Sequence, residues 1–412
     1  MKILFIHQNY PAQYKHLAPA LAAEGHEIVA LKVGTQPTYK NNGVTVVEYQ
    51  LTRGNGKDTH PLVVDFESKI IRAESCFPAL IKLRDLGFYP EVVVGHPGWG
   101  ETLFIKDIWP NAALKIYCEY WYHSEGFDVG FDPEFPTLNP KESAAIRLKN
   151  TNMLLNADIA DSFISPTHWQ ASTFPSHIKE KINVIHDGIN TDIVRPKENA
   201  SFQLDDKKIV TRKDEIITFV NRNLEPYRGY HCFMRSLPKI LKERANAQIL
   251  IVGGDGVSYG AESNSSRTWK QIYIDEVRSN ISDSDWKRVH FLGRVTYENY
   301  ITILQISTVH VYLTYPFVLG WSLLEAMSAG CAIIASDTAP LHEAITHNKN
   351  GILVDFFSNK DLIEKTIDLL DSELERKRIG EAARSFAIAK YDLNTACLPE
   401  QIKWVLSPVA RS

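Results

Sequence analysis

The sequence predicts an α/β fold made of two Rossmann-like, doubly wound domains that face a central cleft. Short apolar runs, such as residues 2–6 and 248–252, have the continuous hydrophobic character of strands buried in a parallel sheet. These runs alternate with helix-like stretches, which is the pattern of βαβ units. The polar, charged segment 195–215 separates two such patterns, and 412 residues are enough for two domains of ordinary size.

Composition and charge exclude several classes of protein. Apolar residues make up 44% of the chain and charged residues 23%, as in ordinary soluble globular proteins. The formal net charge of −4 argues against a general nucleic-acid binder, which needs a basic face. No run approaches the ~20 apolar residues of a membrane-spanning helix, and the apolar start at residues 1–6 is too short for a signal peptide. We therefore expect a cytoplasmic protein.

The five cysteines predict neither a disulfide framework nor a zinc site. They are odd in number, widely scattered, and without C-x-x-C spacing. This distribution is typical of reduced core residues in a cytosolic protein. The residues concerned are Cys76, Cys118, Cys232, Cys331 and Cys397.

The first predicted domain starts as a doubly wound unit. A strand, a helix and two further strands are expected, in that order, at residues 2–6, 17–25, 28–31 and 44–47. The loop after the first strand contains Gln8, Asn9 and Tyr10 but no glycine. A dinucleotide-binding fingerprint needs glycines there, so this loop does not qualify as one.

A helix is expected over residues 62–86, broken at Pro78. Basic residues lie among its apolar positions, but Glu67, Glu74 and Asp85 offset most of their charge. On this ground we favour a solvated helix face over a face that docks on a membrane.

Two polar side chains follow strands of the first domain. The strand at 91–95 ends in a Gly-rich turn that begins with His96, and the strand at 113–118 is followed by Glu119. At this edge of the sheet His96 could bind a substrate or transfer a proton, or it could cap a turn. The residues leave both roles open, and Glu119 is an alternative polar group at the same edge.

The segment 124–141 combines four carboxylates with phenylalanines and prolines. A metal site is conceivable there, but the carboxylates do not follow the spacing of an EF-hand loop. We favour a loop or lid on the substrate side.

The second pattern starts with a strand at 216–220, followed by a loop that holds Arg222 and Arg228. We favour a pair of cations that binds a diphosphate beside a helix start. The alternative is that they are ordinary surface arginines in a loop. A strand at 248–252 ends in a tight turn that contains Gly254. Such a turn is weak evidence of a site when taken alone.

A strand, a loop and a helix are expected next. The strand runs over residues 309–315 and is broken at Pro316. Gly320 lies in the loop, Ser322 is a suitable N-cap residue, and Gly330 closes the helix. The loop therefore lies at the carboxyl end of a parallel strand, where α/β sheets bind ligands.

The start of this helix has the chemistry of a nucleotide-sugar site. The N–H groups of Gly320, Trp321 and Ser322 would point outward and favour an anion. Glu325 lies on the first turn, from which it could reach the hydroxyl groups of a ligand. An anion beside a polyol suggests a nucleotide-sugar.

This stretch resembles the donor site of the retaining GT-B glycosyltransferases, glycosyltransferase family 4 (group 1). The positions that agree in order and spacing are Gly320, Leu324, Glu325, Ala326, Met327, Gly330, Ser336, Glu343, Asn350 and Gly351. One position departs, because Phe317 stands where the family has a Glu that touches the donor sugar. The family's second Glu contacts the ribose and corresponds to Glu325.

Three further segments are similar to the family. The loop 221–229 resembles its G-R-L-x-x-x-K-G loop, with Arg228 in the position of the Lys. Residues 288–295 resemble the strand and turn before the base pocket, and residues 187–192 the segment that closes the first domain.

The resemblance implies a GT-B fold in three parts. Residues 1–195 would bind the acceptor, residues 196–390 would bind the nucleotide-sugar, and residues 391–412 would form a helix that crosses back to the first domain. The expected reaction moves a sugar, with retention, from a nucleoside-diphosphate sugar to a sugar, lipid-linked or small-molecule acceptor. The resemblance implies no cofactor and no metal ion. Some related enzymes dock on membranes, so peripheral contact with the inner face of the membrane is left open.

The resemblance and the residue chemistry together assign roles. The expected catalytic residues are His96, Glu119, Arg222 and Arg228. The expected donor-binding residues are Arg222, Arg228, Gly254, Val295, Leu319, Gly320, Trp321, Ser322 and Glu325. The expected acceptor side consists of Gln8, Asn9, Tyr10 and His96.

Two other classes of protein stay open. A non-catalytic GT-B partner subunit would explain Phe317, although both arginines and Glu325 argue against it. A sugar-nucleotide epimerase of the same fold would need a pair of carboxylates flanking the sugar, and the sequence shows no clear pair.

Overall fold

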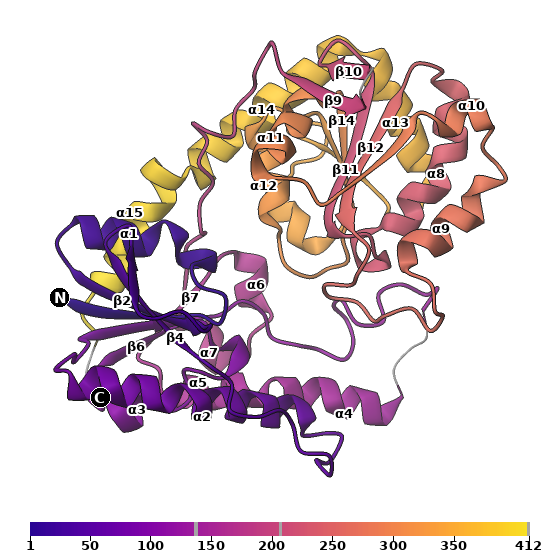
Figure 1. The fold of residues 1–412 in the computed structure, drawn as a ribbon. Coiled ribbons are helices and arrows are strands. Elements are labelled where there is room, and N and C mark those ends of the chain that lie inside the picture. Colours follow the sequence, from indigo (N-terminus) through magenta and orange to yellow (C-terminus); the bar gives the residue numbers. More distant parts are fainter. Residues whose placement is uncertain (136–138, 206–207, 410–412) are drawn as a thin grey trace. The chain divides into compact units, whose positions relative to one another are not determined.

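The computed structural model describes residues 1–135, 139–205 and 208–409. The chain forms two compact units, each built around its own sheet (Figure 1). The first unit comprises Met1–Asp187 with Asn394–Ser412, and the second comprises Gly188–Leu393. The first unit thus ends at Asp187, where the expected boundary was residue 195.

The first unit contains an eight-stranded sheet. Its strands are Lys2–Ile6 (β1), Glu27–Val33 (β2), Tyr39–Asn41 (β3), Val44–Tyr49 (β4), Val92–Gly95 (β5), Ala113–Tyr117 (β6), Ser162–Ser165 (β7) and Ile182–Val184 (β8). The strand order is β3-β4-β2-β1-β5-β6-β7-β8. Every neighbouring pair is parallel except β3 and β4, which are antiparallel.

Helices cover both faces of this sheet. They are Leu17–Ala23 (α1), Val64–Asp85 (α2), Ile105–Ile108 (α3), Pro140–Lys149 (α4), Thr151–Ile159 (α5), His168–Ser172 (α6), Ser176–Lys179 (α7) and Leu398–Leu406 (α15), with short 3-10 helices at Ala12–Lys15 (η1) and Pro97–Trp99 (η2). Ile3 and Phe5 of β1 pack in a core with α1 and α15, whereas Leu4 and Ile6 pack in a core with α2, α3 and α5. Burial on both faces explains why β1 is apolar throughout.

A buried lysine ties α15 to this sheet. Lys115 of β6 is fully buried, and its Nζ donates to the carbonyl oxygens of Trp404 at 2.6 Å and Ser407 at 2.8 Å. The last carbonyl groups of a helix lack partners within the helix, so a cation there satisfies them.

The second unit contains a six-stranded parallel sheet of order β13-β12-β11-β14-β15-β16 and a two-stranded antiparallel sheet of β9 and β10. The strands are Ser201–Asp205 (β9), Lys208–Thr211 (β10), Ile216–Asn223 (β11), Gln248–Gly254 (β12), Val289–Gly293 (β13), Val309–Tyr312 (β14), Ile333–Ser336 (β15) and Ile352–Val354 (β16). The prediction of a two-domain α/β protein with parallel sheets is confirmed.

Helices also flank the second sheet. They are Tyr230–Glu243 (α8), Trp269–Arg278 (α9), Asp283–Trp286 (α10), Tyr297–Ile306 (α11), Trp321–Ser328 (α12), Asn359–Asp371 (α13) and Glu373–Tyr391 (α14), with short 3-10 helices at Pro226–Arg228 (η3) and Ala339–Glu343 (η4), and a π-helix at Leu393–Cys397 (η5). In Figure 1, α11 and α12 lie on one side of this sheet and α8 and α9 on the other.

Two predictions of local structure are wrong. Helix α2 runs through Pro78 without a break, because buried neighbours such as Cys76 and Leu80 hold the surrounding turns in the core. The segment 195–215 is more than a linker, since it contains β9 and β10. Val210 is buried, and Phe202 packs against the core that it belongs to. The many charged residues of this segment hide that apolar contribution.

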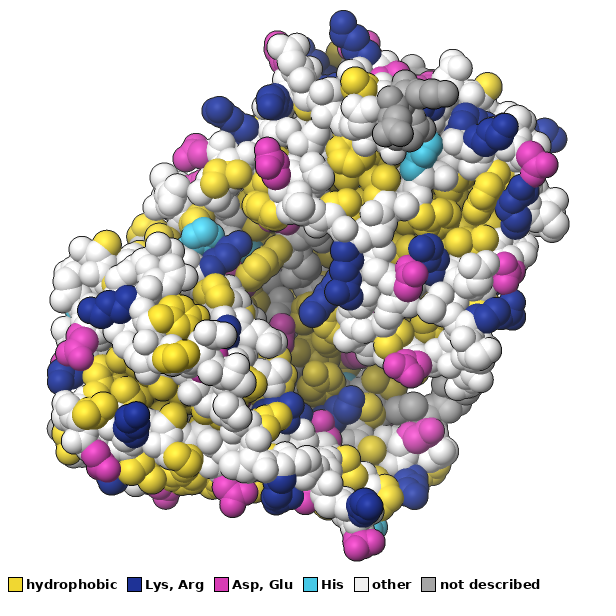
Figure 2. Space-filling model, viewed as in Figure 1, with side chains coloured by type: hydrophobic (Ala, Val, Ile, Leu, Met, Phe, Trp, Pro, Cys, Tyr) yellow, Lys and Arg dark blue, Asp and Glu magenta, His cyan; other side chains and the backbone are white. Residues whose placement is uncertain are grey.

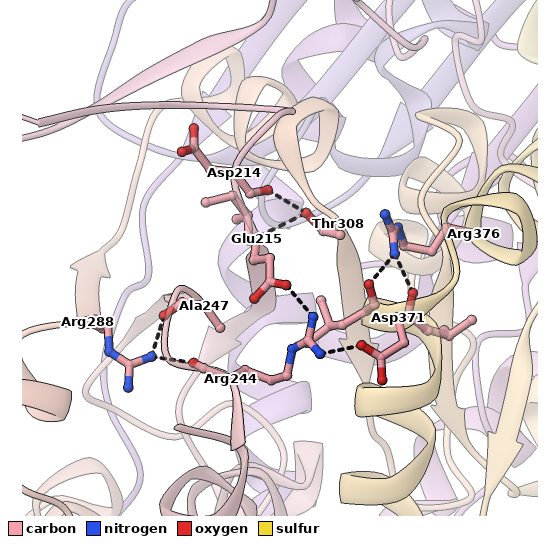
Figure 3. Close-up of polar contacts among 11 residues, drawn as sticks. Asp214, Glu215, Arg244, Ala247, Arg288, Thr308, Asp371 and Arg376 are labelled. Carbon is pink, nitrogen blue, oxygen red and sulfur yellow. Dashed lines mark hydrogen bonds and ion pairs between the residues drawn. The ribbon is translucent and has the colours of Figure 1, made fainter. Parts of the chain in front are cut away.

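The amino ends of the second sheet carry a dense polar network (Figure 3). Arg244, at the end of α8, pairs with Glu215 before β11 and with Asp371 at the end of α13. Arg288 donates to Asp285 at 2.7 Å and to the carbonyl oxygen of Ala247 at 3.0 Å. These contacts join loops and helix ends around the first residues of the strands.

Surface features agree with the composition. On the face shown in Figure 2, Lys and Arg side chains are interspersed with Asp and Glu. All five cysteines lie in the described part of the chain, where each is buried and none forms a disulfide bond. Within the described ranges, no helix combines the length and the apolar character needed to span a membrane.

Candidate functional site

A pocket of about 380 Å³ lies at the carboxyl ends of β11, β12 and β13 in the second unit. It lies at the edge of the sheet where parallel α/β folds bind ligands. The lining residues come from these strand ends and from the start of α11: Asn221, Arg222, Val252, Gly253, Arg294, Val295, Tyr297 and Tyr300. The pocket thus brings together Arg222 and Val295, which are two of the expected donor-binding residues.

Glu325 of α12 is buried and is held by two tyrosines of this lining. Its carboxylate accepts hydrogen bonds from the hydroxyl of Tyr297 at 2.7 Å and from that of Tyr300 at 2.8 Å. Burial raises the pKa of both phenols, and the charge of Glu325 raises it further. Each carboxylate oxygen can accept a second hydrogen bond, so Glu325 retains capacity for ligand hydroxyls.

The tyrosines owe their placement to the first turn of α11. Thr296 is the N-cap and accepts a hydrogen bond from the backbone N–H of Asn299. Tyr297 and Tyr300 then follow at a spacing of three, which puts them on one face of the helix. This spacing was visible in the sequence, but nothing local indicated that the face met Glu325.

Arg228 lies in the 3-10 turn between β11 and α8 and is only 7% exposed. It donates to Thr314 Oγ1 at 2.7 Å, and its guanidinium lies 4.9 Å from the ring centre of Tyr259. Among the described residues, none of its recorded partners is a carboxylate. A buried cation without a counter-charge is costly, so this site is suited to an anionic ligand.

Gly229 allows α8 to start directly behind Arg228. It has a left-handed backbone conformation, with φ of 68°, and a Cβ there would lie 2.3 Å from Cβ of Leu313. Any other residue would therefore be both strained and blocked.

Two arginines, Arg222 and Arg294, line the pocket. Arg222 is exposed, and Arg294 donates to Oδ1 of Asn223 at 3.3 Å. Gly254 lies beside this pair, because a Cβ at Gly254 would meet Asn223 Oδ1 at 2.6 Å. Arg294 was not among the residues singled out from the sequence.

The start of α12 lies after Gly320, which is the N-cap; the N-cap is not Ser322, as the sequence suggested. Ser322 and Trp321 are helical residues of the first turn and are half-buried. Leu319 is buried in the apolar core and Gly330 has the left-handed conformation expected at the helix end. Among the residues that the structure describes, no side chain caps this end of α12.

Phe317 is only 5% exposed. Its ring centre lies 5.4 Å from that of Tyr227 and 5.1 Å from that of Tyr259. The residue that departs from the family pattern is therefore part of an aromatic cluster and presents little surface to a ligand.

The first unit has a cavity of its own, of about 140 Å³. It contains His96 and Glu119 from the carboxyl ends of β5 and β6, together with three tyrosines and several amide and lysine side chains. The full lining is Asp65, Lys69, His96, Pro97, Gly98, Tyr117, Glu119, Tyr120, Tyr122, Lys149, Asn150, Asn152 and Met153.

His96 both caps a turn and contacts Glu119. Its Nδ1 accepts a hydrogen bond from the N–H of Gly98 at 3.1 Å, which leaves the proton of the neutral ring on Nε2. Nε2 lies 3.2 Å from a carboxylate oxygen of Glu119, although the alignment is not ideal for a hydrogen bond. Burial alone would raise the pKa of Glu119, but His96 outweighs it and the pKa is lowered.

The other residues expected on the acceptor side do not line this cavity. Gln8 accepts a hydrogen bond from Nε of Arg72 at 2.6 Å, Asn9 is exposed, and Tyr10 is buried in the core. His7, just before them, lies against His96 with ring centres 5.3 Å apart. Burial lowers the pKa of His7 to about 3, so His7 is neutral near pH 7, and protonation of His96 would lower this pKa further.

Two family models match consecutive parts of the chain. Residues 24–194 match the model described as "Glycosyl transferase family 4 group", and residues 201–386 match "Glycosyl transferases group 1". Between them they account for most of both units.

The chain belongs to the group 1 glycosyltransferases.

Curated relatives of this glycosyltransferase are similar at modest identity. An uncharacterized glycosyltransferase of Methanocaldococcus jannaschii is 31% identical over 44% of this chain and 43% of its own length. A glycogen synthase of Mycobacterium tuberculosis is 22% identical over 96% of this chain and 92% of its own length. For the first four relatives, the match spans about half of the relative's length, between 42% and 57%.

Solved structures support the GT-B fold of this glycosyltransferase. Sucrose-phosphate synthase from Thermosynechococcus elongatus superposes with a TM-score of 0.72 at 18% identity, covering 98% of both chains. Anabaena HepE in complex with UDP-glucose superposes with a TM-score of 0.64 at 14% identity, covering 98% of this chain and 99% of that one. At these identities the likeness shows the fold alone.

Proposed function

We propose that this group 1 glycosyltransferase moves a sugar from a nucleoside-diphosphate sugar to a carbohydrate, lipid-linked or small-molecule acceptor, with retention and without a metal ion. The observation that carries the proposal is the buried guanidinium of Arg228, whose recorded partners among the described residues include no carboxylate. A diphosphate supplies the counter-charge that such a cation lacks.

The nucleoside half of the donor fits the pocket of the second unit. Val252 and Val295 give the pocket an apolar lining, and Tyr297 and Tyr300 add aromatic rings. Both tyrosines donate hydrogen bonds to the carboxylate of Glu325. Ribose hydroxyls can donate to the free lone pairs of Glu325. The similar HepE structure holds UDP-glucose, which supports a nucleotide-sugar as donor.

The diphosphate half fits the cations beside the pocket. Negative charge grows on the diphosphate as the bond to the sugar breaks, and fixed donors that face it lower the barrier. Arg222 and Arg228 provide such donors, and the N-terminus of α12 adds its dipole. Loss of one donor of this kind typically costs about 3 kcal/mol of activation free energy.

The cavity of the first unit is our candidate for the acceptor. Aromatic rings, amides and a partly exposed carboxylate are the groups that bind carbohydrate hydroxyls. Glu119, with 46% of its side chain exposed and its pKa lowered, would accept a hydrogen bond from the attacking hydroxyl. His96 cannot take a proton at Nδ1 without giving up its bond to Gly98, so we assign it to positioning Glu119. In the retaining reaction the acceptor approaches the face that the diphosphate leaves.

The proposal is tested by a screen of nucleoside diphosphates. UDP, GDP and ADP are added to the purified protein, and the shift in melting temperature is followed, since a bound ligand stabilises as RT ln(1 + [L]/Kd). At least one is expected to stabilise the wild type, and Arg228→Met is expected to abolish that shift. If none of the three stabilises the wild type, the nucleotide-sugar proposal is rejected.

The two other classes predict different products. An epimerase would convert the donor alone into an epimer, which NMR of a donor-only incubation detects. A non-catalytic partner subunit would bind the donor but neither hydrolyse it nor transfer its sugar in an acceptor screen. We favour the transferase because Arg222 lines the pocket of the second unit and Glu119 lines the cavity of the first. Arg228 lies in the turn after β11, and Glu325 is bonded to two tyrosines of the pocket lining.

A further inference from the structure

A short segment after β12, residues 256–261, is fastened to the loop that carries Arg228. The carboxylate of Glu225 accepts hydrogen bonds from the backbone N–H of Ser258 at 3.0 Å and of Gly260 at 3.1 Å. Glu225 is fully buried. Carboxylates bound by several N–H groups form strong, charge-assisted hydrogen bonds. Glu225 therefore anchors the backbone of residues 256–261 strongly.

Side chains on either side reinforce the anchor. Asn223 Nδ2 donates to Oγ of Ser258 at 2.7 Å, and Trp269 Nε1 donates to the carbonyl oxygen of Ala261 at 2.9 Å. Residues 257–270 are mostly polar and show neither helical nor strand periodicity, so their sequence does not indicate these contacts. The contacts with Asn223 and Glu225 lie more than thirty positions away along the chain.

Tyr259 is the residue that this anchor presents to Arg228. Its ring centre lies 4.9 Å from the guanidinium carbon, and Phe317 supports the ring from a centre-to-centre distance of 5.1 Å. Tyr259 is nevertheless 43% exposed, unlike Phe317 and Arg228.

A guanidinium has five N–H donors, so contact with one aromatic side chain leaves several of them available. Thr314 accepts from one terminal nitrogen of Arg228, and the Tyr259 hydroxyl is a second side-chain partner. The remaining N–H groups can bind an anion. The ring and Thr314 together therefore set the orientation of the guanidinium.

We propose that Tyr259 is a positioning residue for the donor diphosphate: its ring holds the Arg228 guanidinium in the orientation that receives the phosphate oxygens, and Glu225 keeps the ring in place through the 256–261 segment. This inference rests on the proposed function. It also accounts for Phe317, because an aromatic side chain at that position packs against Tyr259 and a carboxylate would not.

The test separates the ring from the hydroxyl. Binding of the nucleoside diphosphate found in the screen, and of the matching nucleoside, is measured by calorimetry for wild type, Tyr259→Phe and Tyr259→Leu. Tyr259→Leu is expected to weaken the diphosphate by about tenfold, the scale of a partly desolvated cation–π contact, and to leave the nucleoside within about twofold. Tyr259→Phe, which keeps the ring, is expected to restore most of the diphosphate affinity.

Ser266→Ala provides a matched control, because Ser266 is an exposed residue of the same insertion and lies outside the 256–261 segment. Circular dichroism melting of each variant shows that it is folded. The inference is overturned if Tyr259→Leu binds the diphosphate as the wild type does. It is also overturned if Tyr259→Leu loses nucleoside and diphosphate equally, or if Tyr259→Phe is as weak as Tyr259→Leu. If the wild type binds no nucleoside diphosphate at all, the proposed function fails instead.

Discussion

The two ends of the second sheet use arginine in opposite ways. At the amino ends, Arg244 is paired with Glu215 and Asp371 (Figure 3). Arg288 is paired with Asp285. At the carboxyl ends, the recorded partners of Arg222, Arg228 and Arg294 among the described residues include no carboxylate. The first set is satisfied by the protein itself, whereas the second set leaves positive charge for a ligand.

The difference teaches how to separate structural cations from functional ones. Breaking a pair at the amino end leaves a carboxylate without its partner, which lowers stability. Removing a cation that has no counter-charge relieves an electrostatic cost in the free protein and removes a contact only from the complex. A substitution at the amino ends should therefore lower stability without changing ligand affinity. A substitution at the carboxyl ends should lower ligand affinity without lowering stability.

Arg228→Met is expected to have the largest effect. Loss of one charged donor to the diphosphate should lower the transfer rate by roughly 100-fold or more. Stability should stay the same or rise slightly, because the buried charge is gone. A transfer assay measures the rate and a urea melt measures the stability. Calorimetry with a nucleoside diphosphate measures the affinity for the diphosphate. Normal diphosphate binding together with a large loss of stability would assign Arg228 to the structural set.

Glu325→Gln is expected to come next. The amide cannot accept from Tyr297, Tyr300 and two ribose hydroxyls as the carboxylate does, and an unpaired buried group costs ~1–3 kcal/mol. Affinity for ribonucleotide donors should fall by that amount and affinity for 2′-deoxy donors by much less. Glu298→Gln, an exposed acid on α11, is the control. An equal loss for both sugars would show that Glu325 serves the fold and not the ribose.

Arg244→Met tests the amino end. The pairs with Glu215 and Asp371 are only partly buried, so we expect a loss of ~1–2 kcal/mol in the free energy of unfolding. Diphosphate affinity should not change. Lys239→Met, which breaks an exposed i,i+4 pair with Glu243, should cost less than ~0.5 kcal/mol. A fall in diphosphate affinity of the Arg244 variant would remove the distinction between the two ends.

Excess EDTA is expected to have no effect on transfer. If the arginines at the carboxyl end neutralise the diphosphate, no divalent cation is needed for that purpose. The rate is measured with and without EDTA, and then with added Mg²⁺ or Mn²⁺. A rate that EDTA abolishes and either metal restores would mean that the cations at this end are insufficient by themselves.

Much of the candidate donor site could be predicted from short-range patterns. The strand, loop and helix from 309 to 330 follow from local hydrophobicity, Pro316 and the two glycines, and their spacing matches a family pattern. Arg222 and Arg228 were found in the same way, because Arg222 lies at the end of β11 and Arg228 in the turn that follows it. The N-cap was misplaced by two residues, because α12 begins after Gly320 without a side-chain cap, whereas the usual preference for Ser pointed to Ser322.

Partners far apart in the sequence could not be predicted. Tyr297 and Tyr300 meet Glu325 across two elements, and Glu225 holds a segment more than thirty positions away. Arg294 and the cavity around Glu119 also depend on which strands lie side by side. Helix α2 passes through Pro78 for the same reason, because packing outweighed a local preference.

By itself, the sequence determined the kind of most elements, the two α/β units, and the edge of the sheet at which a ligand is expected to bind. These depend on periodicity and on residues a few positions apart, which the backbone places without help from the rest of the chain. Only the tertiary structure decided which charges are neutralised within the protein and which are left for a ligand. The order β13-β12-β11-β14-β15-β16 brings distant loops together, and a cation's role depends on the neighbours that this order provides.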